Sequence, residues 1–148
     1  MQLPKDLQHF PDPTLIVLTD EQEARIFLAG GDAYQTLDSL ALPREFKSDA
    51  EGSFVSSDGS RVGGPSSDLH DTPRKEAFAK TVAEAITRYV REGHAVVVHL
   101  VSPPEMLHLI QARLPADVKP HIAKTLAKDL MKNDILDVIK RLFTLPEA

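Results

Sequence analysis

AVVVHLVSPPEMLHLI, residues 95–110, combines the pattern of a buried strand with that of a helix start. Residues 95–101 form a nearly unbroken run of apolar and β-branched side chains, which is typical of a strand buried on both faces of a sheet. Ser102 then suits a helix cap, Pro103 suits the first helical position, and Glu105 completes a capping box. A strand that feeds directly into a helix predicts a βα unit, so we expect an α/β fold.

Upstream of this unit, three apolar segments with polar turns between them predict an antiparallel meander. The segments are Thr14–Thr19, Ala24–Ala29 and Ala33–Leu42. Residues 1–13 contain three prolines and few apolar side chains, which indicates an arm that lies on the surface. The first part of the chain is therefore expected to contribute three neighbouring strands to the sheet.

Residues 43–71 are rich in glycine and serine and contain few large apolar side chains, a composition typical of a flexible loop. Loops of this length within a small domain are usually functional or disordered, so a functional site is expected here first. Asp71 or Thr72 is the expected cap of the following helix, with Pro73 in its first turn. Apolar side chains at helical spacing predict the buried face of that helix, namely Phe78, Val82, Ile86 and Tyr89.

The C-terminal part contains one ambiguous segment and one clear helix. Residues 121–130 combine apolar side chains at helical spacing with the length of a strand, and Pro120 precedes them. The local pattern leaves helix and strand open for this segment. Asn133 or Asp134 is the expected cap of a final helix over residues 135–143, which has one strongly apolar face.

The composition is that of a soluble protein, because 42% of the 148 residues are hydrophobic and no apolar run approaches the ~20 residues that span a bilayer. The length and the absence of an internal repeat predict a single domain over residues 1–148. The first residues lack the features of a signal peptide and cysteine is absent, so we expect a cytoplasmic protein without membrane contact. The formal charge is −8 over residues 1–71 and +3 over residues 72–148, which is too weakly basic for a dedicated nucleic-acid binder.

No motif for enzymatic chemistry or metal binding stands out. The six histidines form no HExxH pair, and scattered surface or partly buried imidazoles explain them without a metal or another cofactor. Ser102, His108 and Asp129 supply the groups of a nucleophilic triad, but no G-x-S-x-G turn surrounds Ser102. The glycines before Pro65 are not followed by the lysine of a phosphate-binding loop. The residues themselves therefore favour a protein that is not an enzyme.

Short motifs along the chain resemble the bacterial host-attachment protein family, whose members are described as required for attachment to host cells. Asp20 followed by residues 24–27, ARIF, resembles the opening pattern of that family. Residues 78–79, 98–110 and 128–130 are similar to its RFA region, its LVAPPxxLGLLR segment and its KDL motif. These similarities occur in the right order and extend over nearly the whole chain.

That family in turn resembles the middle domain of archaeal and eukaryotic peptide-chain release factors. The resemblance implies a mixed sheet of about five strands, with an antiparallel meander, a glycine-rich loop, and then helix, strand, helix, strand and helix. It also implies a strand within residues 121–130. In release factors a Gly-Gly-Gln tripeptide places water on the peptidyl-tRNA ester, whereas this chain has Gly63-Gly64-Pro65. Proline has neither an N–H group nor a side-chain amide, so we expect no release-factor-like hydrolysis.

The leading hypothesis is a non-catalytic interaction or regulatory module of the host-attachment family, with RNA or the ribosome as its candidate partner. RNA contact is expected at the loop and the start of the long helix, through Arg61, Gly63, Gly64, Arg74 and Lys75. One alternative is a hydrolase that acts on a peptidyl-tRNA ester or a nucleotide through residues 59–71. Another alternative is a factor that contributes to attachment to host cells.

Overall fold

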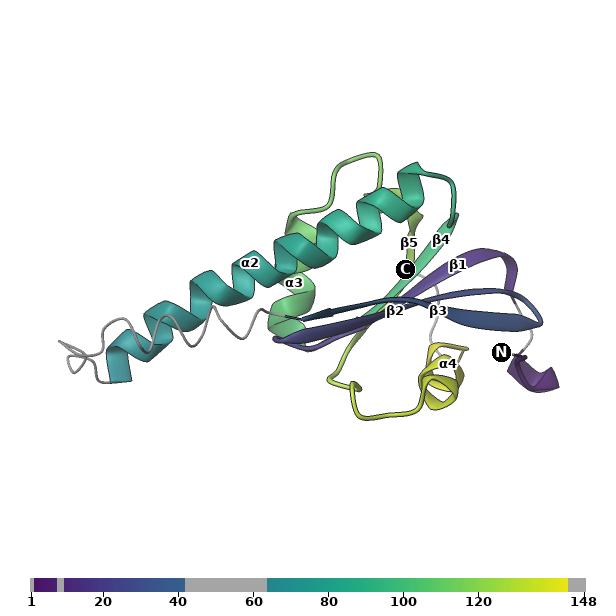
Figure 1. Ribbon diagram of the computed structural model, residues 1–148, viewed down its shortest axis with the longest axis horizontal. Coiled ribbons are helices and arrows are strands. Elements are labelled where there is room, and N and C mark those ends of the chain that lie inside the picture. Colours follow the sequence, from purple (N-terminus) through teal and green to yellow (C-terminus); the bar gives the residue numbers. More distant parts are fainter. Residues whose placement is uncertain (1, 8–9, 42–63, 144–148) are drawn as a thin grey trace.

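The computed structural model describes residues 2–7, 10–41 and 64–143. Over these residues the chain forms one mixed sheet of five strands with helices on both faces (Figure 1). The strand order is β3-β2-β1-β4-β5, so the first strand lies at the centre of the sheet. Within the described residues, no helix has the combination of length and apolar character that is needed to cross a membrane. The predicted α/β class with a mixed sheet is confirmed.

Antiparallel strands on one side of the sheet form the predicted meander. They are β1 (Phe10–Thr19), β2 (Glu23–Gly31) and β3 (Ala33–Ala41). Asp20 shapes the turn between β1 and β2, because its carboxylate accepts hydrogen bonds from the backbone N–H groups of Gln22 and Glu23 at 2.7 and 2.8 Å. The Asp20 side chain thus stabilises a turn that lacks the Asn-Gly pair typical of tight hairpins.

Two parallel strands extend the sheet on the other side of β1. They are β4 (Val97–Ser102), which pairs with β1, and β5 (Ile122–Ala127), which pairs with β4. The inner position of β4 explains its nearly continuous apolar sequence, since both of its faces are covered. The strand alternative for residues 121–130 is right. Pairing with β4 outweighs the helical spacing there, and the short 3-10 helix η3 (Lys119–His121) leads into the strand.

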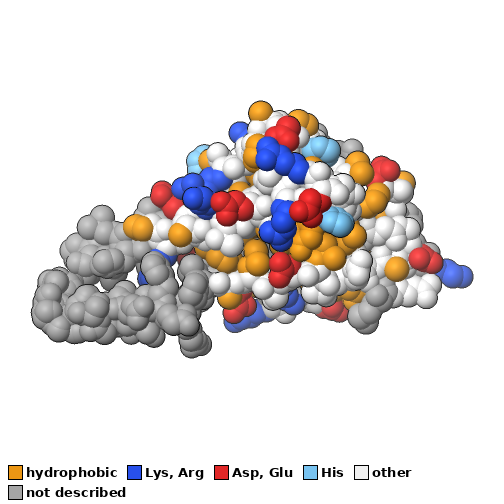
Figure 2. Space-filling model, turned by 45° about the horizontal axis from the view of Figure 1, so that its top comes forward, with side chains coloured by type: hydrophobic (Ala, Val, Ile, Leu, Met, Phe, Trp, Pro, Cys, Tyr) orange, Lys and Arg blue, Asp and Glu red, His pale blue; other side chains and the backbone are white. Residues whose placement is uncertain are grey.

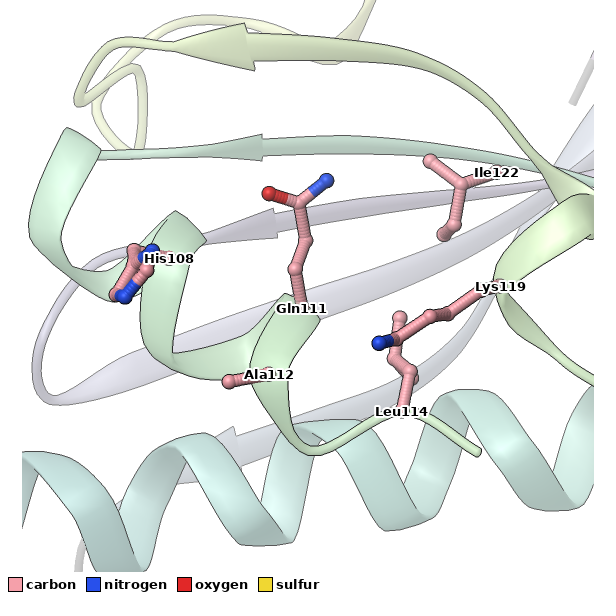
Figure 3. Close-up of a pocket in the computed structure, with 6 residues that line it drawn as sticks. All are labelled: His108, Gln111, Ala112, Leu114, Lys119 and Ile122. Atoms are coloured by element: carbon pink, nitrogen blue, oxygen red, sulfur yellow. The ribbon is translucent and has the colours of Figure 1, made fainter. Parts of the chain in front are cut away.

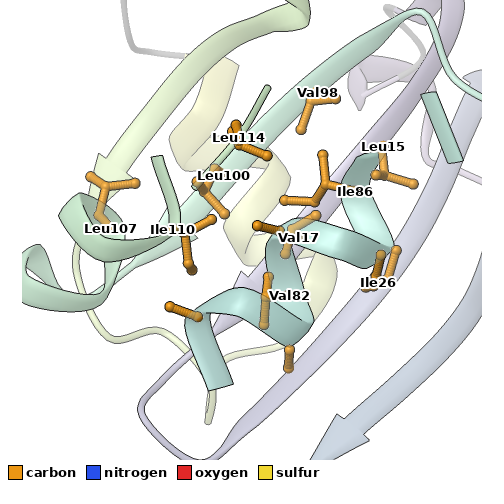
Figure 4. Close-up of a cluster of buried hydrophobic side chains, with 14 of the residues drawn as sticks. Leu15, Val17, Ile26, Val82, Ile86, Val98, Leu100, Leu107, Ile110 and Leu114 are labelled. Atoms are coloured by element: carbon orange, nitrogen blue, oxygen red, sulfur yellow. The ribbon is translucent and has the colours of Figure 1, made fainter. Parts of the chain in front are cut away.

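Helices cover the two faces of the sheet unequally (Figure 1). One face carries α2 (Gly64–Arg91) and α3 (Pro104–Ala112), and the other carries α4 (Ile135–Phe143) and the 3-10 helix η1 (Lys5–Leu7). Because successive strand residues point to opposite faces, each strand contributes to both cores. The core under α2 and α3 includes Leu15, Val17, Ile26, Val82, Ile86, Val98, Leu100 and Ile110 (Figure 4). The predicted buried face of the long helix is therefore confirmed.

The N-terminal residues differ from the predicted surface arm. Leu3 and Leu7 are each only 2% exposed, and Phe10, which is 4% exposed, already belongs to β1. All three side chains join the core on the α4 side of the sheet. Isolated apolar residues in a proline-rich stretch show no periodicity, so the sequence pattern did not reveal their burial.

The start of α2 also differs from the prediction. The helix begins at Gly64, ahead of the predicted cap at Asp71 or Thr72, so the last part of the predicted loop over residues 43–71 is helical. Pro65 is the second residue of the helix, where its fixed φ suits the first turn and its missing N–H leaves no intrahelical bond unmade. The remainder of the predicted loop lies outside the described residues.

Ser102 does not cap α3. It is the last residue of β4, it is fully buried, and its hydroxyl donates to the carbonyl of Pro103 at 3.2 Å. Pro103 occupies the N-cap position without a side-chain cap bond, and Glu105 contacts Lys75 instead of closing a capping box. Pairing of Ser102 with Ala127 extends β4 past its apolar run and holds this serine in the sheet.

Candidate functional site

Three of the five predicted RNA-contact residues, Gly64, Arg74 and Lys75, lie on α2 in the described part of the chain. Arg61 and Gly63 lie outside the described residues, and Gly64 is the first residue of α2. Arg74 lies on the same helix, roughly 15 Å from Gly64 along the axis. A single phosphate group cannot reach both positions at once.

Lys75 is held between carboxylates. Its Nζ lies 3.0 Å from Oε1 of Glu105 and 3.4 Å from Oε2 of Glu21, and its side chain is only 21% exposed. The hydrogen bond to Glu105 raises the pKa of Lys75 above its usual value. This cation links α2 to α3 and to the β1–β2 turn. Two neighbouring negative charges oppose the approach of a phosphate, so the environment of Lys75 is that of a structural contact.

The three groups that the sequence offered as a nucleophilic triad do not contact one another. Ser102 is buried and engaged with Pro103, His108 is exposed on α3, and Asp129 is exposed after β5, where it accepts a hydrogen bond from the backbone of Met131 at 3.2 Å. No hydrogen bond between described residues joins these three side chains. Nor do the described residues include a group of three or more His, Asp or Glu side chains that could hold a metal ion.

A groove of about 750 Å³ lies between α2 and the end of α3. Its first wall is one stripe of α2, consisting of Lys80, Ala83, Glu84, Thr87, Arg88 and Arg91. Its second wall contains Ala112, Arg113 and Pro115. The α2 stripe recurs at helical spacing and is roughly 17 Å long from Lys80 to Arg91. The groove therefore presents a continuous helix face, in which the small side chain of Ala83 lies among charged side chains.

Each of the three arginines that line this groove lies near a carboxylate. Arg91 donates two hydrogen bonds to Asp117, from Nε at 3.0 Å and from Nη2 at 2.8 Å, and this contact lowers the pKa of Asp117 below its usual value. The other two arginines of the groove also lie near carboxylates, at 3.9 Å for Arg88–Asp38 and 3.8 Å for Arg113–Glu76. Figure 2 shows side chains of both signs next to one another on this side of the molecule. The face is a mosaic of charges and not a positive surface.

His99 is a buried polar residue whose environment the sequence did not reveal. It lies on β4 and is 6% exposed, on the same side of the sheet as α4. Its Nδ1 has no hydrogen-bond partner within the described part of the chain. Burial, with a smaller contribution from the positive charge of Lys124, lowers the pKa of His99 to about 4. The residue is thus held neutral at physiological pH.

These features define a three-layer α/β domain with a groove between its two neighbouring helices. The family model described as "Protein required for attachment to host cells" matches residues 15–142, and the chain belongs to this family. The match includes the second half of β1, the other four strands and nearly the whole of the last helix. The family resemblance of the short sequence motifs is therefore confirmed. A search of curated proteins gave no match.

Two solved structures show similarity to the chain. One, described as an archaeal protein, is 16% identical with a TM-score of 0.51, and the alignment covers 86% of this chain and 33% of that one. The other, described as an archaeal translation termination factor, is 13% identical with a TM-score of 0.48 and coverages of 87% and 37%. The chain thus spans about a third of the length of these proteins. At 16% identity the first similarity shows the fold alone.

Proposed function

We propose that this domain is a non-catalytic interaction module of the host-attachment family and that it binds a protein partner in the α2–α3 groove. The observation that supports the proposal most strongly is the combination, in one groove, of small side chains with charged side chains of both signs. Ala83, Ala112 and Pro115 leave room for an inserted side chain, while the charged side chains supply both donors and acceptors. An amphipathic helix of a partner fits such a groove, because its apolar face can meet the small side chains and its polar edges can meet the charged ones.

The charge pattern favours a protein over a nucleic acid at this groove. A phosphate backbone gains affinity from cations that release counterions, and a cation already paired with a carboxylate has less to contribute. Arg91 would have to leave Asp117, and Arg88 would have to approach a phosphate beside Asp38. Glu84 and Glu92, which also line the groove, add repulsion. A partner with side chains of both signs meets none of these obstacles.

RNA contact through the start of α2 is a second candidate function. It is supported by the placement of Gly64, Arg74 and Lys75 on one helix, although Lys75 is engaged with Glu105. Salt-sensitive sedimentation with ribosomes, lost when Arg61, Arg74 and Lys75 are reversed in charge, would support this candidate over the groove. Hydrolysis through residues 59–71 stays a prediction, as does a cytoplasmic location. A contribution to host-cell attachment, the role in the family description, would follow from the partner that the domain recruits.

Two matched substitutions test the groove. Lys80→Trp places a bulky side chain at the groove wall, whereas Lys140→Trp makes the same change at an exposed position of α4, on the other side of the sheet. We expect wild-type protein and Lys140→Trp to capture the same partner from an extract of the source cells after nuclease treatment, and Lys80→Trp to lose it. Capture that disappears with nuclease, or that Lys80→Trp retains in full, would contradict the proposal.

A further inference from the structure

A second, smaller pocket of about 380 Å³ lies between the end of α3 and the beginning of β5 (Figure 3). Its lining residues are His108, Gln111, Ala112, Leu114, Lys119 and Ile122. The volume falls within the range of pockets that take small molecules. The groove wall shares only Ala112 with this pocket, which otherwise opens toward different residues.

Polar groups of the pocket favour a negatively charged ligand. Lys119 carries the only Lys or Arg charge in the lining, and among the described residues no Asp or Glu lines the pocket. Figure 3 shows the Gln111 amide and the Lys119 ammonium extending into the same space, with His108 at its far end. An ammonium and an amide N–H donor that line one pocket can each donate to a different oxygen of a carboxylate.

The position of α3 favours one negative charge over two. Gln111 and Ala112 belong to the last turn of this helix, where the helix dipole is negative. The dipole opposes every anion and opposes a dianion such as phosphate more than a monoanion, so the one positive charge of Lys119 offsets the repulsion of a single negative charge more fully. A carboxylate, with one charge, matches the single cation of Lys119 better.

Apolar groups form the rest of the pocket. Leu114 is 4% exposed and Ile122 is half-buried, and both face the space beside the Lys119 ammonium (Figure 3). The ligand therefore needs an apolar body next to its charge, because contact with a bare ion would leave these side chains in water.

The backbone that carries Lys119 is fixed by the fold. Its N–H donates to the carbonyl of Pro115 at 3.0 Å, and the neighbouring Val118 is fully buried. On the other side, Nδ1–H of His121 donates to the carbonyl of Val96 at 2.7 Å and so attaches η3 to the chain entering β4. A cation on an anchored turn needs little reorganisation to bind a ligand.

We propose that the pocket between α3 and β5 binds a small organic monocarboxylate with an aliphatic or aromatic body, held by Lys119 and Gln111. This ligand site is separate from the proposed protein-binding groove. Occupation of the pocket would stabilise the junction of α3, η3 and β5.

Titration of the full chain with hexanoate, followed by amide chemical shifts, tests the proposal. We expect saturable shifts confined to the end of α3, η3 and the start of β5. Lys119→Gln should weaken binding by about tenfold or more, since hydrogen bonds to charged groups contribute on that scale. Lys119→Arg should retain binding, and Lys140→Gln, an exposed lysine of α4, should leave it unchanged.

Three further probes make the result decisive. Hexan-1-ol has the apolar body without the charge, and acetate has the charge without the body. Inorganic phosphate, tested as the dianion, has two negative charges and no apolar body. All three should bind at least about tenfold more weakly than hexanoate if charge and body are both recognised. Equal binding of hexan-1-ol or phosphate, unchanged affinity in Lys119→Gln, or no saturable shift with hexanoate would overturn the proposal. Capture of a protein partner by the groove is read separately, so the two proposals can fail independently.

Discussion

Replacement of His99 by leucine should change how the stability of the domain depends on pH. His99 is buried on β4, its Nδ1 lacks a partner within the described part of the chain, and its pKa is lowered to about 4. In the unfolded chain the same imidazole has its ordinary pKa of 6.5. The unfolded state therefore binds a proton between these two values while the folded state does not. Folding stability is then complete above pH 6.5 and falls as the pH is lowered toward 4.

The magnitude follows from the two pKa values. Their difference corresponds to roughly 3 kcal/mol over the full range, and roughly 2 kcal/mol of it is lost between pH 7 and pH 5. Leucine removes the titrating group and fills a similar volume. Because leucine removes the buried Nδ1 that has no partner among the described residues, His99→Leu should be at least as stable as the wild type at pH 7.

Urea unfolding at pH 7, 6 and 5 measures this difference. We expect the wild type to lose roughly 2 kcal/mol more than His99→Leu over this range. Gln35→Leu is the control, because Gln35 is exposed on β3 and carries no titrating group, so its replacement should leave the pH dependence of the wild type in place. The same pH dependence in the wild type and His99→Leu would refute the assignment of a neutral, buried imidazole.

Three other predictions concern the core, a turn and an ion pair at the groove. Ile110→Ala should lower the free energy of unfolding by about 3 kcal/mol in urea titrations, since Ile110 lies on α3 and is fully buried in the core that α2 and α3 form with the sheet. A loss below about 1 kcal/mol would contradict this burial. Gly93→Ala should lower it by about 1 kcal/mol, because Gly93 has φ +83 and an added Cβ meets no atom within 4 Å, so only the backbone is strained. An unchanged unfolding curve would show that the turn relaxes. Arg91→Ala should raise the pKa of Asp117 toward its usual value, as measured by carboxyl carbon shifts, and an unchanged pKa would mean that the ion pair does not persist in solution.

The sequence predicted those elements whose local pattern agrees with their place in the sheet. Most of the run over residues 95–101 forms β4, where residues 98–101 are buried, whereas Val96 precedes the strand and is exposed. The stripe of α2 that includes Val82 and Ile86 packs with side chains of β1 and β2 in one core. Ser102 was misassigned because its identity suits a cap, while strand pairing with Ala127 decides its conformation. The start of α2 was placed too late because Asp and Thr are favoured residue types at helix N-caps. Asp71 and Thr72 lie inside the helix, which already begins at Gly64.

Sites that depend on packing between distant segments were not visible in the sequence. Lys80, Glu84 and Arg88 follow one another at helical spacing on α2, but only the fold adds Ala112 and Pro115 as the opposite wall of the groove. His99 could be placed on a strand from its neighbours. Its burial follows from the packing of α4 on that side of the sheet. The spacing of residues near His99 in the sequence cannot predict a contact with this distant helix.

The most direct test of the interaction module is a photo-reactive amino acid placed at Lys80 in the groove, and at Lys140 as the control on α4. Each variant is irradiated in its own cells, and the crosslinked products are separated and identified by mass spectrometry. The account predicts one discrete protein adduct from position 80 that is absent from position 140. An adduct that contains RNA, or the same products from both positions, would contradict it.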